Sequence, residues 1–200
     1  MANSLLFPPH GPDPRQQGQW LATDVEPHEE WSEALRDGTV VRIRPIGKDD
    51  VDLERRFIEE LSPESRRFRF LGEIRTPSPQ LLHQLTHPER TEAAFIAVLN
   101  EGENEKEIGV SRFSARNDQM NCEFAVAVAD EWHNKGLASL LMTHLISTAR
   151  RRGIECMYAV AASGNHAMHE LAKHLGFQSE PNPNDATEVI YTLDLRAPTV

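Results

Sequence analysis

The sequence predicts a mixed α/β domain in which helices flank one central sheet. Three observations support this fold class: short β-branched runs alternate with helical patterns along most of the chain, polar turns join several neighbouring strands, and the strongest helical pattern lies between two strands. Strands joined by short turns pair antiparallel, whereas a strand–helix–strand unit forms a right-handed parallel crossover. We therefore expect a mostly antiparallel, twisted sheet that contains one parallel β-α-β crossover.

Residues 1–37 differ from the rest because they are rich in proline and poor in periodic apolar positions. We interpret them as an N-terminal arm with a short helix near Glu29–Leu35. The composition fits both a loose tail and an arm packed on the domain or on a second subunit, and Trp20 and Trp31 favour packing. The Asp-Gly pair that ends this segment is a turn signal, so we expect the folded domain to span residues 38–196.

Seven segments have the alternating, β-branched pattern of strands. In chain order they are Thr39–Pro45, Ala93–Leu99, Glu107–Ala115, Asn121–Val128, Cys156–Ala161, Phe177–Glu180 and Thr187–Leu193. The polar stretch Asn100–Lys106 predicts a turn between the second and third of them, and Asn117-Asp118 predicts the next turn. These short connections make the strands on either side antiparallel neighbours.

Five segments show helical periodicity or a helix start. They are Lys48–Leu61, the segment that starts at Ser62-Pro63, Pro79–Leu85, Leu137–Arg152 and Asn165–Leu175. The fourth has the strongest pattern, because its leucines recur on one face. Its last turn is rich in arginine and Gly153 follows it, which is typical of a helix C-terminus.

Charge and composition restrict the function classes. The chain has 31 acidic and 21 basic side chains, a formal charge of −10, which disfavours nucleic-acid binding and suits a basic partner such as an amine. Its apolar runs are far shorter than a membrane span, and its first residues lack the pattern of a signal peptide. Cys122 and Cys156 cannot form a disulfide framework, so we expect a cytoplasmic protein.

A candidate anion site lies between the strand Asn121–Val128 and the long helix that follows it. Its residues are His133, Asn134, Lys135, Gly136, Leu137 and Ala138. Free N–H groups at a helix N-terminus bind anions, Gly136 permits close approach, Lys135 adds a cation, and the small Ala138 leaves its N–H open. This pattern predicts a phosphate or pyrophosphate site, and the alternative is an ordinary strand-to-helix turn. The segment is neither a Walker loop nor the dinucleotide pattern GxGxxG.

The same six residues resemble the phosphate-binding signature of the GNAT acyltransferase superfamily, which reads Gln or Arg, two residues, Gly, one residue, then Gly or Ala. His133 departs from it at the first position, which in the family acts largely through its backbone. Two later features agree, namely Arg-Arg-Gly-Ile after the long helix and Asn165 followed by Leu175-Gly176-Phe177. The resemblance covers about Thr39 to Leu195. It implies the GNAT fold, acetyl-CoA as cosubstrate and no metal.

Within this superfamily the chain is most similar to bacterial Pat-type protein lysine acetyltransferases. The segments that carry this likeness are Arg42–Ile46, Leu61–Phe70 and Cys122–Val128. It implies an N-acetyltransferase that works by direct attack in a ternary complex, with a lysine on a protein, such as an acyl-CoA synthetase, as the acceptor. A small-molecule amine acceptor and a non-catalytic acyl-CoA-binding module are the alternatives. The sequence is silent on oligomeric state.

Glu123 is the candidate general base. A lysine amine has a pKa of about 10.4 and must lose a proton before it attacks a thioester. Strand alternation places Glu123 on one face with Ala125 and Ala127, and the small alanines leave room for a ligand beside the carboxylate. The residues alone also fit a solvent-facing glutamate, whereas the resemblance to Pat-type enzymes implies the catalytic role.

The resemblance implies further roles along the cofactor. The Val126 N–H is expected to stabilise the oxyanion, and Val126 and Val128 to pair with the pantetheine amides. Asn165 matches a family asparagine near the pantetheine arm, although Asn suits a helix N-cap equally well. Ala172 stands where the family often has a thiolate-protonating tyrosine, so the proton donor to the leaving thiolate is open.

Two other interpretations receive little support from the sequence. His166, His169 and His174 invite a metal site, but no cysteine or acid pattern completes it. Cys122 lies next to Glu123 and invites the role of a nucleophile, but alternation directs its thiol to the opposite face of the strand.

Overall fold

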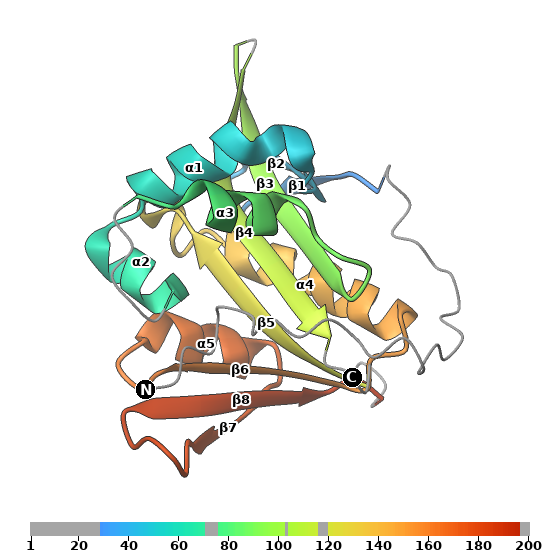
Figure 1. Ribbon diagram of the computed structural model, residues 1–200, viewed down its shortest axis with the longest axis vertical. Helices are drawn as coiled ribbons and strands as arrows, with labels where there is room; N and C mark the ends of the chain where they lie inside the picture. The colour runs from blue at the N-terminus through green and yellow to red at the C-terminus, as the bar shows by residue number, and fades with distance from the viewer. Residues whose placement is uncertain (1–28, 71–75, 103, 116–119, 197–200) are drawn as a thin grey trace.

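The computed structural model describes residues 29–70, 76–102, 104–115 and 120–196, which form one eight-stranded sheet with helices on both faces (Figure 1). The strands are β1 Trp31–Ala34, β2 Val40–Pro45, β3 Glu92–Glu101, β4 Asn104–Ala115, β5 Asn121–Val128, β6 Cys156–Ala162, β7 Gln178–Pro181 and β8 Glu188–Asp194. The helices are α1 Val51–Glu60, α2 Pro63–Phe70, α3 Pro79–Thr86, α4 Leu137–Arg151 and α5 His166–His174, and the short 3-10 turns are η1 Lys48–Asp50 and η2 Asp130–Trp132.

The order of the strands in the sheet is β1-β2-β3-β4-β5-β6-β8-β7. All neighbouring strands pair antiparallel except β5 and β6, which pair parallel and which α4 connects. A connection between parallel neighbours has to cross the sheet, and a helix packed on one face is the usual solution. The predicted mixed sheet with one β-α-β crossover is confirmed.

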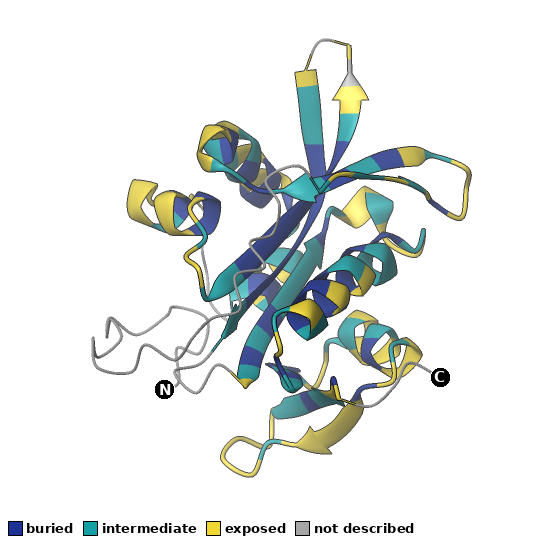
Figure 2. Ribbon diagram, turned by 90° about the vertical axis from the view of Figure 1, so that its right-hand side faces the viewer, coloured by how far each residue is buried: buried dark blue, intermediate teal, exposed yellow. Residues whose placement is uncertain are grey.

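Two apolar clusters hold the helices on the sheet. The helix α4 packs on one face, where Leu141 and Leu145 are fully buried. The helices α1 and α3 cover the other face, where Ile58 and Leu82 pack with Ile96 of β3. Figure 2 shows the buried residues along the central strands and on the sheet-facing side of α4. The middle of the sheet is therefore covered on both sides.

The strand β7 forms one edge of the sheet. Its four residues are exposed and the last is Pro181. A proline at an edge removes a backbone donor and so limits pairing with another chain.

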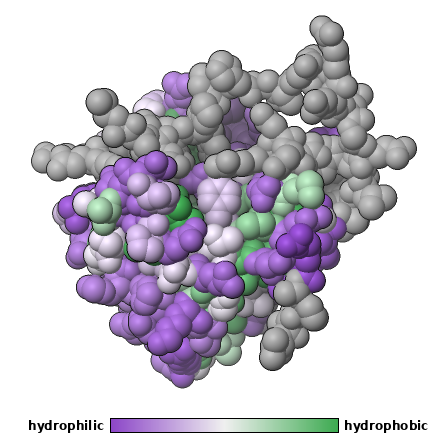
Figure 3. All heavy atoms as spheres, turned by 90° about the horizontal axis from the view of Figure 1, so that it is seen from below, coloured by the Kyte–Doolittle hydropathy of each residue, from purple (hydrophilic) through white to green (hydrophobic). Residues whose placement is uncertain are grey.

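Seen from below, most of the described surface is hydrophilic, with a smaller hydrophobic area between the polar side chains (Figure 3).

The helix predicted near Glu29–Leu35 is wrong, because Trp31–Ala34 form the strand β1 at the other edge of the sheet. Trp31 packs edge-on against Phe95, with ring centroids 5.3 Å apart, and stacks on His144 of α4 at 4.1 Å. This packing overrides the helix propensity of the segment. The described fold thus begins before the predicted boundary at residue 38, while residues 1–28 of the arm lie outside the described residues.

The turn predicted over Asn100–Lys106 is wrong in its extent. The strands β3 and β4 stay paired out to Glu101 and Asn104, so the hairpin extends beyond the rest of the sheet (Figure 1). Backbone hydrogen bonds across the hairpin outweigh the polar character of these residues. The turn predicted at Asn117-Asp118 lies outside the described residues.

Four charged side chains are buried around β4. Glu54 of α1, Arg69 of α2, and Glu107 and Arg112 of β4 are each at most 7% exposed. Burial, followed by the nearby Glu54, raises the pKa of Glu107 well above its ordinary value. A hydrogen bond shared with the Glu54 carboxyl raises the pKa of Glu107 further, because a proton has to be kept for the two acids to share. The neutral acid is therefore the favoured form of Glu107 in the folded protein.

Replacing Glu107 by glutamine is expected to remove a pH dependence of stability. Because the pKa of Glu107 is raised by folding, the free energy of unfolding falls as pH rises from about 4.5 towards the raised value. Glutamine mimics the neutral acid, so Glu107→Gln should be more stable than the parent at pH 8 by about 1 kcal/mol or more. Denaturant unfolding at pH 5 and pH 8 measures this, with the exposed Glu180→Gln as the control. An unchanged pH dependence in Glu107→Gln would contradict the prediction.

Candidate active site

The strands β5 and β6 separate after a short paired stretch. Their paired residues are Asn121 with Cys156, Cys122 with Met157, and Glu123 with Tyr158. Both strands continue beyond these pairs, to Val128 and Ala162. From Phe124 onward, the residues of β5 no longer pair with β6. The backbone N–H and C=O groups on that edge of β5 are therefore candidates to pair with an extended ligand. The loop that leads into α4 begins directly after β5, so this opening adjoins the N-terminus of α4.

Glu123 occupies the last paired position before the two strands separate. Tyr158, its partner in register on β6, donates a hydrogen bond from its hydroxyl to Glu123 Oε2 at 3.4 Å. Both side chains are half-buried. The sequence indicated Glu123 but not Tyr158, because no local pattern records which residues of two distant strands become neighbours.

The face that carries Glu123 is the one predicted. Cys122, Phe124 and Val128 belong to the apolar cluster beneath α4, whereas Ala127 packs in the cluster on the opposite face. Glu123 therefore projects away from α4, on the face covered by α1 and α3. Burial raises the pKa of the Cys122 thiol, which disfavours the thiolate needed for a nucleophile.

The predicted phosphate loop has the backbone conformation that an anion site needs. Asn134 and Gly136 both have positive φ, at 62° and 90°, and α4 begins directly afterwards at Leu137. Gly136 is the N-cap and offers no side chain to the first turn, so the N–H groups there lack a side-chain acceptor. The ring of His133 donates from Nε2 to the carbonyl of Val128 at 2.9 Å. His133 thus ties the loop to the end of β5 through its side chain, and not only through its backbone.

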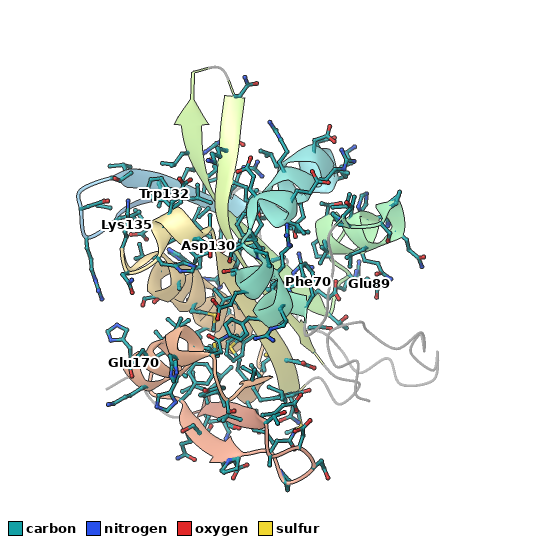
Figure 4. All side chains as sticks on the ribbon, turned by 90° about the vertical axis from the view of Figure 1, so that its left-hand side faces the viewer. Phe70, Glu89, Asp130, Trp132, Lys135 and Glu170 are labelled. Carbon is teal, nitrogen blue, oxygen red and sulfur yellow. The ribbon has the colours of Figure 1, made fainter. Side chains whose placement is uncertain are left out.

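Lys135 is engaged by neighbouring side chains. Its ammonium lies 3.1 Å from Asp37 Oδ2 and 4.2 Å from the ring centroid of Trp132. Figure 4 shows Lys135 and Trp132 close together at the start of α4. Hydrogen bonds from Thr39, followed by Lys135, lower the pKa of Asp37 to about 2, so this carboxylate is charged at neutral pH. Lys135 is therefore less available to a ligand than the sequence suggests.

Asp130 joins the same loop to α2. It accepts hydrogen bonds from the Ser62 N–H at 2.9 Å, the Ser62 hydroxyl at 2.7 Å and the Ser65 hydroxyl at 2.8 Å. Burial would raise the pKa of Asp130, but these hydrogen bonds outweigh it and lower that pKa. The start of α2, which begins at Pro63 as predicted, is thereby fixed to the end of β5.

The remaining positions singled out in the sequence lie on β5 and at α5. Val126 is half-buried on the part of β5 beyond the paired stretch. Asn165 caps α5, because its Oδ1 accepts a hydrogen bond from the Met168 N–H at 3.0 Å. Ala172 is buried in the core beneath α5. The structure thus confirms the capping role of Asn165, while its role toward pantetheine stays a prediction.

The described residues contain neither a metal-binding cluster nor a helix that could span a membrane. The described part of the chain contains no group of three or more His, Cys, Asp or Glu side chains placed to hold a metal ion. Among the same residues, no helix is both long enough and apolar enough to span a membrane.

This geometry, with an opening between two parallel strands next to a glycine-containing helix start, agrees with a comparison with known families. A model of the acetyltransferase (GNAT) family matches residues 55–177, which is more than half of the chain. The chain belongs to the GNAT family. An acetyltransferase of Pseudomonas aeruginosa is 45% identical to this GNAT protein over 166 residues, which cover 82% of this chain and 89% of the relative. The Acetyltransferase Pat of Mycolicibacterium smegmatis is 30% identical over 144 residues, which cover 71% of this chain and 42% of that relative.

Solved structures have the same fold as this GNAT protein. The GNAT domain of S. lividans PAT matches with a TM-score of 0.76 and 26% identity, covering 82% of this chain and 96% of that domain. A cAMP-binding acyltransferase from Mycobacterium smegmatis shares the fold, with a TM-score of 0.56 and 24% identity over 84% of this chain and 47% of its own. The predicted family, fold and enzyme class are confirmed: the protein is an N-acetyltransferase, and enzymes of its family use acetyl-CoA.

Proposed function

We propose that this enzyme acetylates the side-chain amine of a lysine on a protein acceptor, by direct attack on acetyl-CoA with Glu123 as general base. The observation that carries the proposal is the place of Glu123, at the point where β5 and β6 separate and on the face opposite α4. A carboxylate there lies next to the part of β5 that no longer pairs with β6, where an extended ligand could add to the strand, and the small side chain of Ala125 lies on the same face as Glu123. The similarity to Pat-type lysine acetyltransferases supports a protein acceptor.

The proposed step is a single displacement on the acetyl carbonyl. The lysine ammonium gives a proton to Glu123, the neutral nitrogen attacks the carbonyl carbon, and a tetrahedral oxyanion forms. Backbone N–H groups of β5 beyond Glu123, with Val126 as the first candidate, would stabilise that oxyanion. The C–S bond then breaks and the thiolate of CoA leaves with the electron pair, while the nitrogen gives its second surplus proton to that thiolate or to water, which leaves a neutral amide.

A panel of acceptors tests this function. The enzyme is incubated with acetyl-CoA and, separately, with an acyl-CoA synthetase, a lysine-containing peptide and small amines, while CoA release and the acetylated product are measured. Turnover with site-specific lysine acetylation of the protein is expected. Turnover on small amines alone would overturn the proposed acceptor. Tight acetyl-CoA binding without turnover on any amine would support a non-catalytic module instead.

Tyr158 is expected to position Glu123 and to stabilise its carboxylate. Removing the donated hydrogen bond in Tyr158→Phe should lower kcat roughly tenfold and move the acid limb of the kcat/KM profile to higher pH by up to about one unit. The profile between pH 5 and pH 10 measures both effects. The other tyrosine, buried on β8, supplies the matched control as Tyr191→Phe. A parental pH profile in Tyr158→Phe would contradict the positioning role.

A further inference from the structure

The turn between β1 and β2 docks on the phosphate loop. Within the turn, the Leu35 N–H donates to the Thr39 carbonyl at 2.8 Å and the Gly38 N–H donates to the Leu35 carbonyl at 2.9 Å. Between these residues, the Arg36 N–H donates to the carbonyl of Lys135 at 3.1 Å. Arg36 and Lys135 are thus held together although they are distant in sequence, and this hydrogen bond joins the turn to the loop.

The side chain of Arg36 lies over Gly136. A Cβ atom built on Gly136 would be 3.5 Å from both Cγ and Nε of Arg36. Arg36 is exposed, and within residues 29–70, 76–102, 104–115 and 120–196 no carboxylate forms an ion pair with its guanidinium. An unpaired guanidinium therefore lies beside the glycine at which the backbone of this family's phosphate loop approaches the diphosphate.

The ammonium of Lys135, unlike the guanidinium of Arg36, already has a partner carboxylate. It is paired with Asp37 at 3.1 Å and lies on the ring of Trp132. Moving it to a phosphate would break the ion pair with Asp37, which belongs to the same turn as Arg36. The ion pair is better suited to hold the turn in place than to bind the ligand. Arg36 and Lys135 therefore differ in whether a neighbouring carboxylate already pairs with their charge.

We propose that Arg36 binds the diphosphate of the acyl-CoA donor and that the pair of Lys135 and Asp37 positions the turn that carries it. This inference rests on the proposed function only in taking acetyl-CoA as the ligand. A guanidinium offers planar, paired donors that match phosphate oxygens, and it complements the free N–H groups at the start of α4. The N-terminal strand then contributes directly to donor binding.

Calorimetric titration with acetyl-CoA tests the proposal. Arg36→Gln should raise the Kd by about 10- to 100-fold, as expected for the loss of one charge-assisted hydrogen-bonded contact. The loss should be as large with 3′-dephospho-CoA, which keeps the diphosphate, and absent with S-acetylpantetheine, which lacks all phosphates. In kinetics, the variant should raise KM for acetyl-CoA and leave kcat near the parental value. Arg36→Lys should restore part of the affinity.

Matched variants separate the outcomes. Arg56→Gln removes an exposed arginine of α1 and makes the same change in net charge, so the Kd should stay within about twofold. A parental Kd in Arg36→Gln, or a larger loss in Lys135→Gln than in Arg36→Gln, would overturn the proposal. A loss seen with acetyl-CoA but not with 3′-dephospho-CoA would overturn it in favour of the 3′-phosphate. Failure of the parent protein to bind acetyl-CoA would overturn the proposed function as well, whereas a change confined to Arg36→Gln concerns Arg36 alone.

Discussion

Glu123→Gln is expected to lower kcat by about 10²- to 10⁴-fold, the usual contribution of a general base. Glutamine keeps the shape of the side chain and can still accept a hydrogen bond from Tyr158, but it cannot take the proton of the attacking ammonium. The donor site on β5 and the loop before α4 are unchanged, so the Kd for acetyl-CoA should stay within about twofold. Steady-state acetylation and calorimetry on the same preparation measure the two quantities.

A distant glutamate supplies the control for this variant. Glu180 is exposed on the edge strand β7, so Glu180→Gln makes the same chemical change away from the opening and should retain full activity. Because free amine becomes abundant at high pH, Glu123→Gln should also recover part of its rate as pH rises towards 10. Parental kcat at pH 7.5 in Glu123→Gln would rule out the general-base role.

Gly136→Val is expected to weaken acetyl-CoA binding by about 100-fold or more. The residue has φ 90°, a left-handed conformation that a β-branched residue strongly disfavours, and the new side chain would also contact Arg36. Either the loop changes conformation, which misdirects the N–H groups of the first turn of α4, or the valine occupies the position where we expect the diphosphate to approach. Each lost charge-assisted hydrogen bond costs about 10- to 100-fold in affinity. Titration with acetyl-CoA measures the effect.

The other end of α4 offers a matched glycine. Gly153 has φ 75° and no atom within 4 Å of a built Cβ, so Gly153→Val introduces similar backbone strain without a ligand nearby. Both variants should lose about 1–2 kcal/mol of stability, which denaturant unfolding measures. Only Gly136→Val should lose affinity. Equal loss of affinity in both variants would show that general destabilisation, and not the loop, is responsible.

Much of the fold could be predicted from local patterns. The 3.6-residue period of Leu137–Arg152 predicts the crossover helix α4, and the Ser-Pro pair at Ser62 predicts the start of α2. These signals are short-range, because a helix or a cap is stabilised by residues three or four positions apart. The segment near Glu29–Leu35 shows the limit of such patterns. Its strand conformation depends on Trp31 packing against β3 and α4, which no local pattern records.

Local patterns also predict only part of the candidate site. Local patterns were enough to predict the glycine-containing loop from His133 to Ala138 before α4 and the face of Glu123, since a turn next to a helix start and the two-residue alternation of a strand are local properties. No local pattern predicts that β5 and β6 separate after Glu123, that Tyr158 is its neighbour, or that Arg36 rather than Lys135 faces Gly136 without a partner carboxylate. These depend on strand register and on the docking of a distant turn. Both are set by packing between segments that are far apart in the chain.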